Sequence, residues 1–141
     1  MAIYTATAAQ AAVQPKGLRV GLVAVKSTFS IAVTLSAGDV FQMVKVPANA
    51  TPVFVQFGGT NTTPSYNMAV GDGISVGRYR SDASYSAAAG MLTAYVNTAA
   101  ITPYTYSTDD TIDITLSTVT ASAFSSGGAF YLNAIFSMDA T

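Results

Sequence analysis

The sequence is divided into short apolar runs, and this pattern limits the possible fold more than any other feature. Runs of roughly five to nine residues rich in Val, Ile, Thr, Tyr and Phe are separated by Gly, Pro, Asn, Asp or Ser. β-branched and aromatic residues favour strands, whereas the separating residues favour turns. Glu, a good helix former, is absent from the sequence. We therefore predict an all-β chain.

The apolar runs predict about eight to ten short antiparallel strands, a number and spacing typical of a β-sandwich or barrel. A jelly-roll-like sandwich is the architecture that we expect. One core suits 141 residues, so residues 16–141 are predicted to form a single β-sandwich domain and residues 1–15 an N-terminal arm or first strand. The expected strands cover residues 18–25, 29–35, 39–46, 52–57, 66–70, 74–79, 91–96, 104–106, 112–119 and 130–138.

Alternation within the runs predicts which side chains face the core. In residues 39–46, Lys45 shares a face with Phe41 and Met43, so the opposite face, which carries Val44 and Val46 together with Val40 and Gln42, is the expected core side. In residues 112–119, Ile112, Ile114 and Leu116 alternate with Asp113, Thr115 and Ser117, which predicts a half-buried strand with Asp113 in solvent. In residues 130–138, one face carries Phe130, Leu132, Ala134, Phe136 and Met138.

The connections between strands are predicted from charged and turn-forming residues. Two candidate strands, 18–25 and 29–35, are expected to join near Lys26 and Ser27. Residues 46–52 (VPANATP) predict a hairpin-like connection, and residues 58–64 a loop, because Pro and Gly interrupt strand pairing. The alanine-rich part of residues 83–100 could instead form a helical turn that stops at Gly90.

Charge is the most unusual aspect of the composition. Only 9% of residues are charged, against about 25% in a typical soluble domain. Residues 46–71, 83–108 and 114–138 carry no charge at all. Such a surface repels its neighbours weakly and suits packing within an assembly.

The same composition argues against several partners and cofactors. A net charge of −1 offers no basic footprint for nucleic acid. Cys and His are absent, so thiolate and imidazole metal sites cannot form. Polar residues interrupt every uncharged span, and the N-terminus lacks a basic start and an apolar core, so we expect neither a membrane helix nor a secretory signal. We expect no cofactor and no metal.

Residues 73–77 (GISVG) match the G-x-S-x-G motif of serine hydrolases. A nucleophilic Ser75 would need a base, and the chain has no His; a Lys partner would leave only a Ser and Lys dyad. The glycine spacing does not fit a phosphate-binding loop either. Asp72 and Gly73 between apolar runs instead predict a hairpin turn with positive φ angles, followed by a strand at residues 74–79. We expect no catalytic residues and no enzyme activity.

Two charged clusters remain. Arg78 and Arg80 would share one face of the expected strand, where they can pair locally with Asp72 or Asp82 or contact an acidic partner. Asp109, Asp110 and Asp113 form the densest acidic group, but they lack the order of an EF-hand loop. A turn at Asp109 and Asp110 is the simpler interpretation, and nothing in the pattern predicts a buried acid for glycoside hydrolysis.

Eight tyrosines and no tryptophan accompany the scarcity of charge. Tyrosine suits protein interfaces because a rigid ring buries area at small entropic cost, although core packing or a sugar-binding face would also use it. Residues 2–14 could form an arm that adds to a neighbouring sheet, with Ile3 and Tyr4 as its contacts. The alternatives are a frayed terminus or the first strand.

Three segments together resemble small structural proteins of tailed bacteriophages, above all head decoration (cement) proteins. They are VPANA at 46–50, VGDG at 70–73 followed by Arg78 and Tyr79, and DTIDITL at 110–116, which precedes a final apolar strand. The resemblance implies a non-enzymatic β-sandwich on the capsid exterior, made in the host cytoplasm and often trimeric. It implies the major capsid protein and further copies of the chain as partners, and neither nucleic acid nor membrane.

The resemblance predicts a capsid decoration protein that stabilises the phage head. Its interface residues are predicted to be Ile3, Tyr4, Arg78 and Arg80. Two alternatives stay open: a receptor- or carbohydrate-binding domain of a tail or fibre, and a self-assembling shell protein.

Overall fold

The structure, a computed structural model, is a sandwich of two β-sheets. It describes residues 1–10, 21–32, 34–60, 66–85, 91–96, 104–119 and 128–138. Within these ranges the elements follow one another in the order β1 (Ile3–Thr5), α1 (Thr7–Gln10), β2 (Gly21–Ser30), β3 (Val40–Val46), β4 (Ala50–Thr60), β5 (Tyr66–Gly71), β6 (Arg80–Tyr85), β7 (Met91–Val96), β8 (Asp110–Val119) and β9 (Ala129–Met138).

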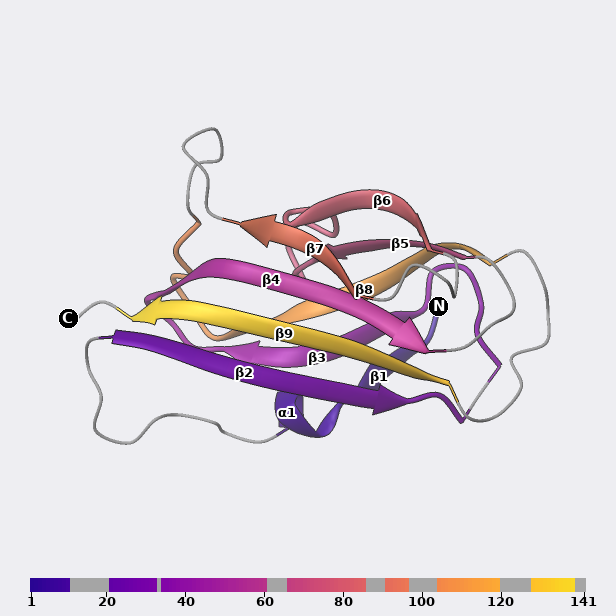
Figure 1. Cartoon of the computed structure of the whole chain (residues 1–141), viewed down its shortest axis with the longest axis horizontal. Coiled ribbons are helices and arrows are strands. Elements are labelled where there is room, and N and C mark those ends of the chain that lie inside the picture. Colours follow the sequence, from indigo (N-terminus) through magenta and orange to yellow (C-terminus); the bar gives the residue numbers. More distant parts are fainter. Residues whose placement is uncertain are drawn as a thin grey trace.

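The strand order of the two sheets is jelly-roll-like. One sheet has the order β2-β9-β4-β7 and the other β1-β3-β8-β5-β6. The chain therefore crosses between the sheets at nearly every step, which is the interleaved Greek-key pattern of jelly rolls. In Figure 1, β2, β9 and β4 lie in front of β3 and β8. The prediction of an all-β sandwich is confirmed. The described strands pair in antiparallel fashion except β1, which runs parallel to β3.

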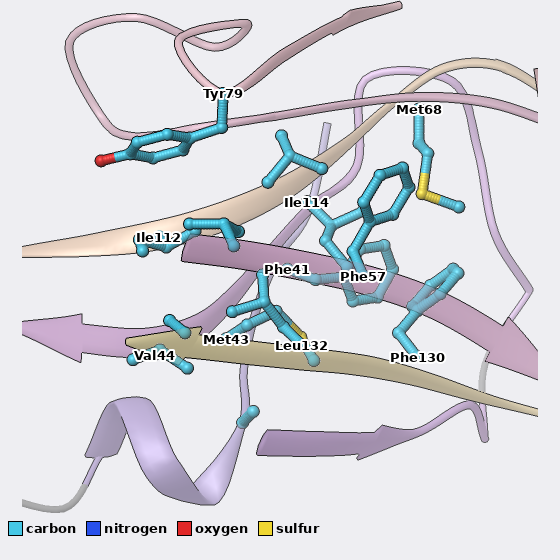
Figure 2. Packing of buried hydrophobic residues seen from close by; sticks show 14 of the residues in the cluster. Phe41, Met43, Val44, Phe57, Met68, Tyr79, Ile112, Ile114, Phe130 and Leu132 are labelled. Carbon is cyan, nitrogen blue, oxygen red and sulfur yellow. The ribbon is translucent and has the colours of Figure 1, made fainter. Parts of the chain in front are cut away.

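The core lies between the sheets and is filled from both. Figure 2 shows large side chains of β3, β4, β8 and β9 meeting between the ribbons. The rings of Phe41 and Phe130 bridge the two sheets with centroids 4.8 Å apart. Burying each such side chain stabilises the fold by about 1.5–3 kcal/mol. The predicted inward residues of β8 and β9 are confirmed, since Ile112, Ile114, Leu116, Phe130, Leu132, Ala134 and Phe136 are all buried.

The core face of β3 differs from the prediction. Phe41 and Met43, expected outside, are buried, whereas Val40 and Gln42 are partly exposed. The cause is a bulge, because Gln42 pairs with Asp113 and Val44 with Ile112, so that Met43 has no partner in the register. The bulge reverses the alternation and lets the adjacent residues Met43 and Val44 both face the core.

Two other strand boundaries were predicted wrongly. β2 is one continuous strand that pairs over its whole length with β9, so Lys26 and Ser27 lie inside it, and the described residues between 31 and 35 are not strand. β4 extends through Gly58 and Gly59 to Thr60. A Cβ on Gly59 would lie 3.0 Å from the Ala129 carbonyl oxygen, so glycine here permits close pairing and does not begin a loop.

The connection after β3 is a turn between sheets. Residues 47–49 join β3 to β4, but these strands belong to different sheets, so the predicted hairpin-like pairing is wrong. Asn49 adopts a φ of 66°, a left-handed conformation that Asn tolerates well. The turn thereby reverses the chain across the end of the sandwich.

The N-terminal residues lie on one side of the sandwich. β1 extends the five-stranded sheet beside β3, and α1 packs against β2 and β3. Residues 11–20, the alanines predicted as a helical turn (87–89) and Gly90 lie outside the described residues. β6 and β7 occupy the described parts of 83–100. Within the described part of the chain, no helix is long and apolar enough to cross a membrane.

Candidate interface loop

The loop at residues 72–79, which joins β5 to β6, is organised around one buried carboxylate. Asp72 is 2% exposed. Its Oδ1 accepts hydrogen bonds from the backbone N–H groups of Ile74 (3.0 Å) and Ser75 (2.7 Å), as is usual for an Asp that begins a turn. The Asp72 N–H in turn donates to the Ser75 carbonyl at 3.0 Å. These bonds fix the first half of the loop.

Arg78 closes the second half of the loop on the same carboxylate. Its guanidinium forms a salt bridge with Asp72 and lies over the ring of Tyr104, 3.5 Å from the centroid. Burial alone raises the pKa of Asp72, but the hydrogen bonds from Arg78, Ser75, Tyr106 and Ile74 outweigh burial and hold it below 3.8. Burial lowers the pKa of Arg78, but the hydrogen bond and the charge of Asp72 outweigh burial and raise the pKa of Arg78. The predicted local pairing of Arg78 is confirmed.

Two tyrosines anchor the loop to the rest of the sandwich. The Tyr106 hydroxyl donates to Asp72 Oδ2 at 3.0 Å and also bonds the Tyr79 hydroxyl. The Tyr106 backbone pairs with the turn after β3: its N–H donates to the Ala50 carbonyl, and its carbonyl accepts from Asn49 N–H at 2.7 Å. Burial raises the pKa of Tyr106, and Tyr79 and Asp72 raise it further, so its hydroxyl stays protonated. The predicted strand at residues 104–106 is wrong, since these residues belong to no strand; Tyr106 instead links the loop to the turn after β3.

Among the glycines of this segment, Gly71 is required for space, and none of the three adopts a positive φ. Gly71, Gly73 and Gly77 are not among the described residues with positive φ, contrary to the predicted two-residue hairpin turn. A Cβ on Gly71 would lie 2.0 Å from the Ser75 carbonyl oxygen, so the loop folds directly onto β5. The predicted strand at residues 74–79 is also wrong, since β6 begins only at Arg80.

The hydrolase motif therefore lies in a closed turn. Ser75 supplies backbone atoms to that turn through its N–H, which donates to Asp72, and its carbonyl, which accepts from Asp72 and Arg78. A nucleophile elbow needs a helix directly after the serine, but here the chain continues through the turn into β6. What the motif presents to solvent is apolar: the side chains of Ile74 and Val76, whose residues are 76% and 51% exposed.

The four predicted interface residues are not brought together. Ile3 and Tyr4 lie on β1 and Arg80 on β6, and these strands are the opposite edges of one sheet. Ile3 is 61% exposed. The ring of Tyr4, in contrast, stacks on Phe41 with centroids 5.0 Å apart and packs against the hydrophobic core of this chain. Arg78 is held by Asp72, and Arg80 is exposed.

A second buried carboxylate lies beside the loop. Asp113, predicted in solvent, is 6% exposed, and its Oδ1 has no hydrogen-bond partner in the structure. It pairs across the sheet with Gly71 on one side and Gln42 on the other. Burial raises the pKa of Asp113 to about 7; a hydrogen bond from Thr111 opposes the rise, and the charges of Asp110 and Asp72 add to it. The prediction that no acid is buried was wrong.

The other two acids of the predicted cluster, Asp109 and Asp110, are arranged separately. Asp109 accepts a hydrogen bond from Ala48 N–H at 3.0 Å and pairs with Lys45 at 3.3 Å, which together lower its pKa. Asp110 Oδ1 accepts from Thr111 N–H. Among the described residues, no group of three or more acidic, histidine or cysteine side chains is placed to hold a metal ion.

Sequence comparison does not identify a family, whereas the fold has clear counterparts. No protein-family model matches the sequence, and no curated protein matches it. A chain in the capsid of Ralstonia phage GP4 superposes with a TM-score of 0.78 at 14% identity, over 99% of this chain and 100% of that chain. This chain has the fold of a phage capsid chain of similar length, and the resemblance to phage structural proteins has a structural basis.

Two further capsid chains share the fold at lower similarity. One is from the capsid asymmetric unit of cyanophage Pam1, with a TM-score of 0.57, 17% identity, and coverage of 91% of this chain and 92% of that chain. The other is from the acid-stable capsid of Helicobacter pylori bacteriophage KHP30, with a TM-score of 0.57, 13% identity, and coverage of 85% and 90%.

Proposed function

We propose that the protein is a non-enzymatic decoration protein that binds the exterior of a phage capsid and stabilises the head. The observation that carries this proposal is the correspondence of whole chains: this chain and the Ralstonia phage GP4 capsid chain match over almost their full lengths.

The surface supports a role in an assembly. A net charge of −1 and a charged fraction of 9% keep repulsion between neighbouring copies small. Apolar side chains of Ile3, Leu22, Ile74 and Val76 are exposed. The proposed partners are the major capsid protein and, in a homotrimer, two further copies of this chain. Contacts of modest strength, repeated over many copies, would together resist the internal pressure of packaged DNA.

Reconstitution tests the proposal. Capsids of the source phage prepared without the protein are mixed with the purified chain, and the bound fraction and the temperature of capsid rupture are measured. We expect saturable binding at a fixed ratio to the major capsid protein and a higher rupture temperature. An absence of binding at micromolar protein would refute the decoration role. Light scattering of the free protein gives the oligomeric state, for which we expect a discrete trimer; particles of shell size would instead indicate a self-assembling shell protein.

A further inference from the structure

The tip of the loop, defined as Ile74 and Val76, differs from the other exposed apolar residues. Leu22 is a single exposed residue on β2, whereas Met1 and Ile3, also two residues apart, lie at the N-terminus and at the start of β1 and not in a loop. Single exposed apolar side chains are common on protein surfaces. Ile74 and Val76 are two residues apart in one loop and together form an apolar projection between Gly73 and Gly77.

The tip is held in place before any partner binds. The Asp72 carboxylate accepts from Ile74 N–H and Ser75 N–H, and Arg78 N–H donates to the Ser75 carbonyl at 3.1 Å. Gly71 lets the backbone at Ser75 rest on β5. A loop that is already ordered loses little conformational entropy on binding, so the buried apolar area contributes more fully to affinity.

The charge next to the tip indicates the chemistry of the partner. A Cβ on Gly77 would lie 3.2 Å from the Ser81 Cα, so the loop returns alongside the first residues of β6. Arg80 is exposed there, and among the side chains that the structure describes no carboxylate forms an ion pair with it. Arg78 is not free to bind a partner because Asp72 holds it. The surface thus combines two apolar side chains with a guanidinium on the Gly77 side, while the Asp110 carboxylate, which accepts from Thr111 N–H, lies on the Gly73 side.

We propose that the tip and Arg80 form the docking surface of this protein, and that their partner is a capsid-shell surface with a carboxylate beside an apolar side chain. This inference rests on the decoration role proposed above. The apolar tip supplies the buried area, and the ion pair with Arg80 fixes the orientation and speeds association.

Binding to undecorated capsids tests the docking surface with matched variants. The double variant Ile74→Ser/Val76→Ser removes the tip, and Arg80→Glu reverses the charge. Leu22→Ser is the control, because Leu22 is 68% exposed, close to the 76% of Ile74, but lies on β2 in the other sheet. We expect the dissociation constant to rise about 30-fold for the double variant and about 10-fold for Arg80→Glu, and to change less than about 2-fold for Leu22→Ser.

Salt provides an independent readout of the ion pair. Raising NaCl from about 0.05 M to about 0.5 M shortens the screening length, so wild-type binding should weaken. Binding of Arg80→Glu should not weaken with salt. Circular dichroism and thermal unfolding of each variant verify the fold; the milder substitutions Ile74→Ala and Arg80→Gln replace any variant that unfolds early.

The outcomes separate the two proposals. If the wild type does not bind capsids, the decoration role fails. If the wild type binds and the tip variants bind equally well, the decoration role stands and the docking surface is overturned. Loss of self-association in the double variant, with capsid binding unchanged, would likewise overturn it, because the tip would then contact a second copy of this chain.

Discussion

Asp72 and Asp113 are both buried carboxylates at the same end of β5, yet they differ in the hydrogen-bond donors and charges that surround them. Asp72 is surrounded by donors from Ile74, Ser75, Arg78 and Tyr106, and its pKa lies below 3.8. Asp113 pairs across the sheet with Gly71, next to Asp72, but its Oδ1 has no donor and its pKa is raised to about 7. Burial alone therefore does not decide the charge of an acid; the number of hydrogen-bond donors and the sign of the neighbouring charges do.

We expect the largest effect on stability from a substitution of Asp72. The substitution Asp72→Ala leaves the Arg78 charge without its partner and two loop N–H groups without an acceptor. We expect the free energy of unfolding to fall by about 3–5 kcal/mol, as for other broken buried pairs. Urea denaturation at neutral pH measures the loss. Asp72→Asn keeps an acceptor for the loop N–H groups but removes the charge, and it should cost clearly less; equal losses for the two variants would show that the lost charge, and not the lost acceptor, accounts for the effect.

The pH dependence of stability tests Asp113. Because its folded pKa is raised to about 7, the folded protein binds more protons than the unfolded chain between pH 4 and 7. Its stabilising contribution is complete below about pH 4 and is lost as pH rises through 7. Asp72 has the opposite sign: its contribution is present above its ordinary pKa and is lost as pH falls through its lowered folded value.

The substitution Asp113→Asn removes the first of these dependences. At pH 8 it should stabilise the protein by on the order of 3 kcal/mol, and at pH 4 it should have little effect. Urea denaturation of the wild type and of Asp113→Asn at several pH values measures both effects. A wild-type stability that does not decline between pH 5 and 8 would contradict the raised pKa of Asp113.

Gly71 is adjacent to both carboxylates, because it precedes Asp72 in the sequence and pairs with Asp113 across the sheet. A Cβ in Gly71→Ala would collide with the Ser75 and Val76 backbone, so the loop must lift from β5. We expect a loss of about 2 kcal/mol in unfolding free energy. The pKa of Asp113 should also move toward its ordinary value as water enters, which carboxyl NMR titration can follow. Gly73→Ala is the control, because its nearest atom would be a flexible Asp110 side chain at 3.4 Å.

The smallest expected effect comes from removing one donor. Tyr106→Phe deletes the hydroxyl that donates to Asp72 Oδ2 and keeps the buried ring. We expect a loss of about 1–2 kcal/mol in unfolding free energy and a higher pKa of Asp72. Acid titration of the Asp72 carboxyl by NMR measures the shift. An unchanged pKa would show that Arg78 and the loop N–H groups suffice.

The sequence predicts the parts of the fold that depend on local alternation. The inward faces of β8 and β9 follow from a strict period of two and are confirmed. β3 was mispredicted because its bulge depends on the register with β8, which is distant in sequence. β2 was divided at Lys26 because a charge inside a strand resembles a break, whereas its side chain lies on the exposed face.

The site was predictable only where partners are close in sequence. The pairing of Arg78 with Asp72 spans six residues and follows from the sequence. The contribution of Tyr106, 34 residues from Asp72, does not. Asp113 fits an alternating polar face, and its burial depends on neighbours that the topology brings beside it. The exposed tip could have been found by noticing that Ile74 and Val76 are the apolar residues of a glycine-bounded turn.

Electron cryo-microscopy of reconstituted capsids tests the central claim most directly. Undecorated capsids are mixed with the wild-type protein and, in parallel, with Ile74→Ser/Val76→Ser. The decoration role predicts ordered density for the sandwich on the outer surface of the shell, with residues 73–77 at the contact, and loss of that density for the double variant. A shell without added density, or the chain built into the continuous shell itself, would contradict it.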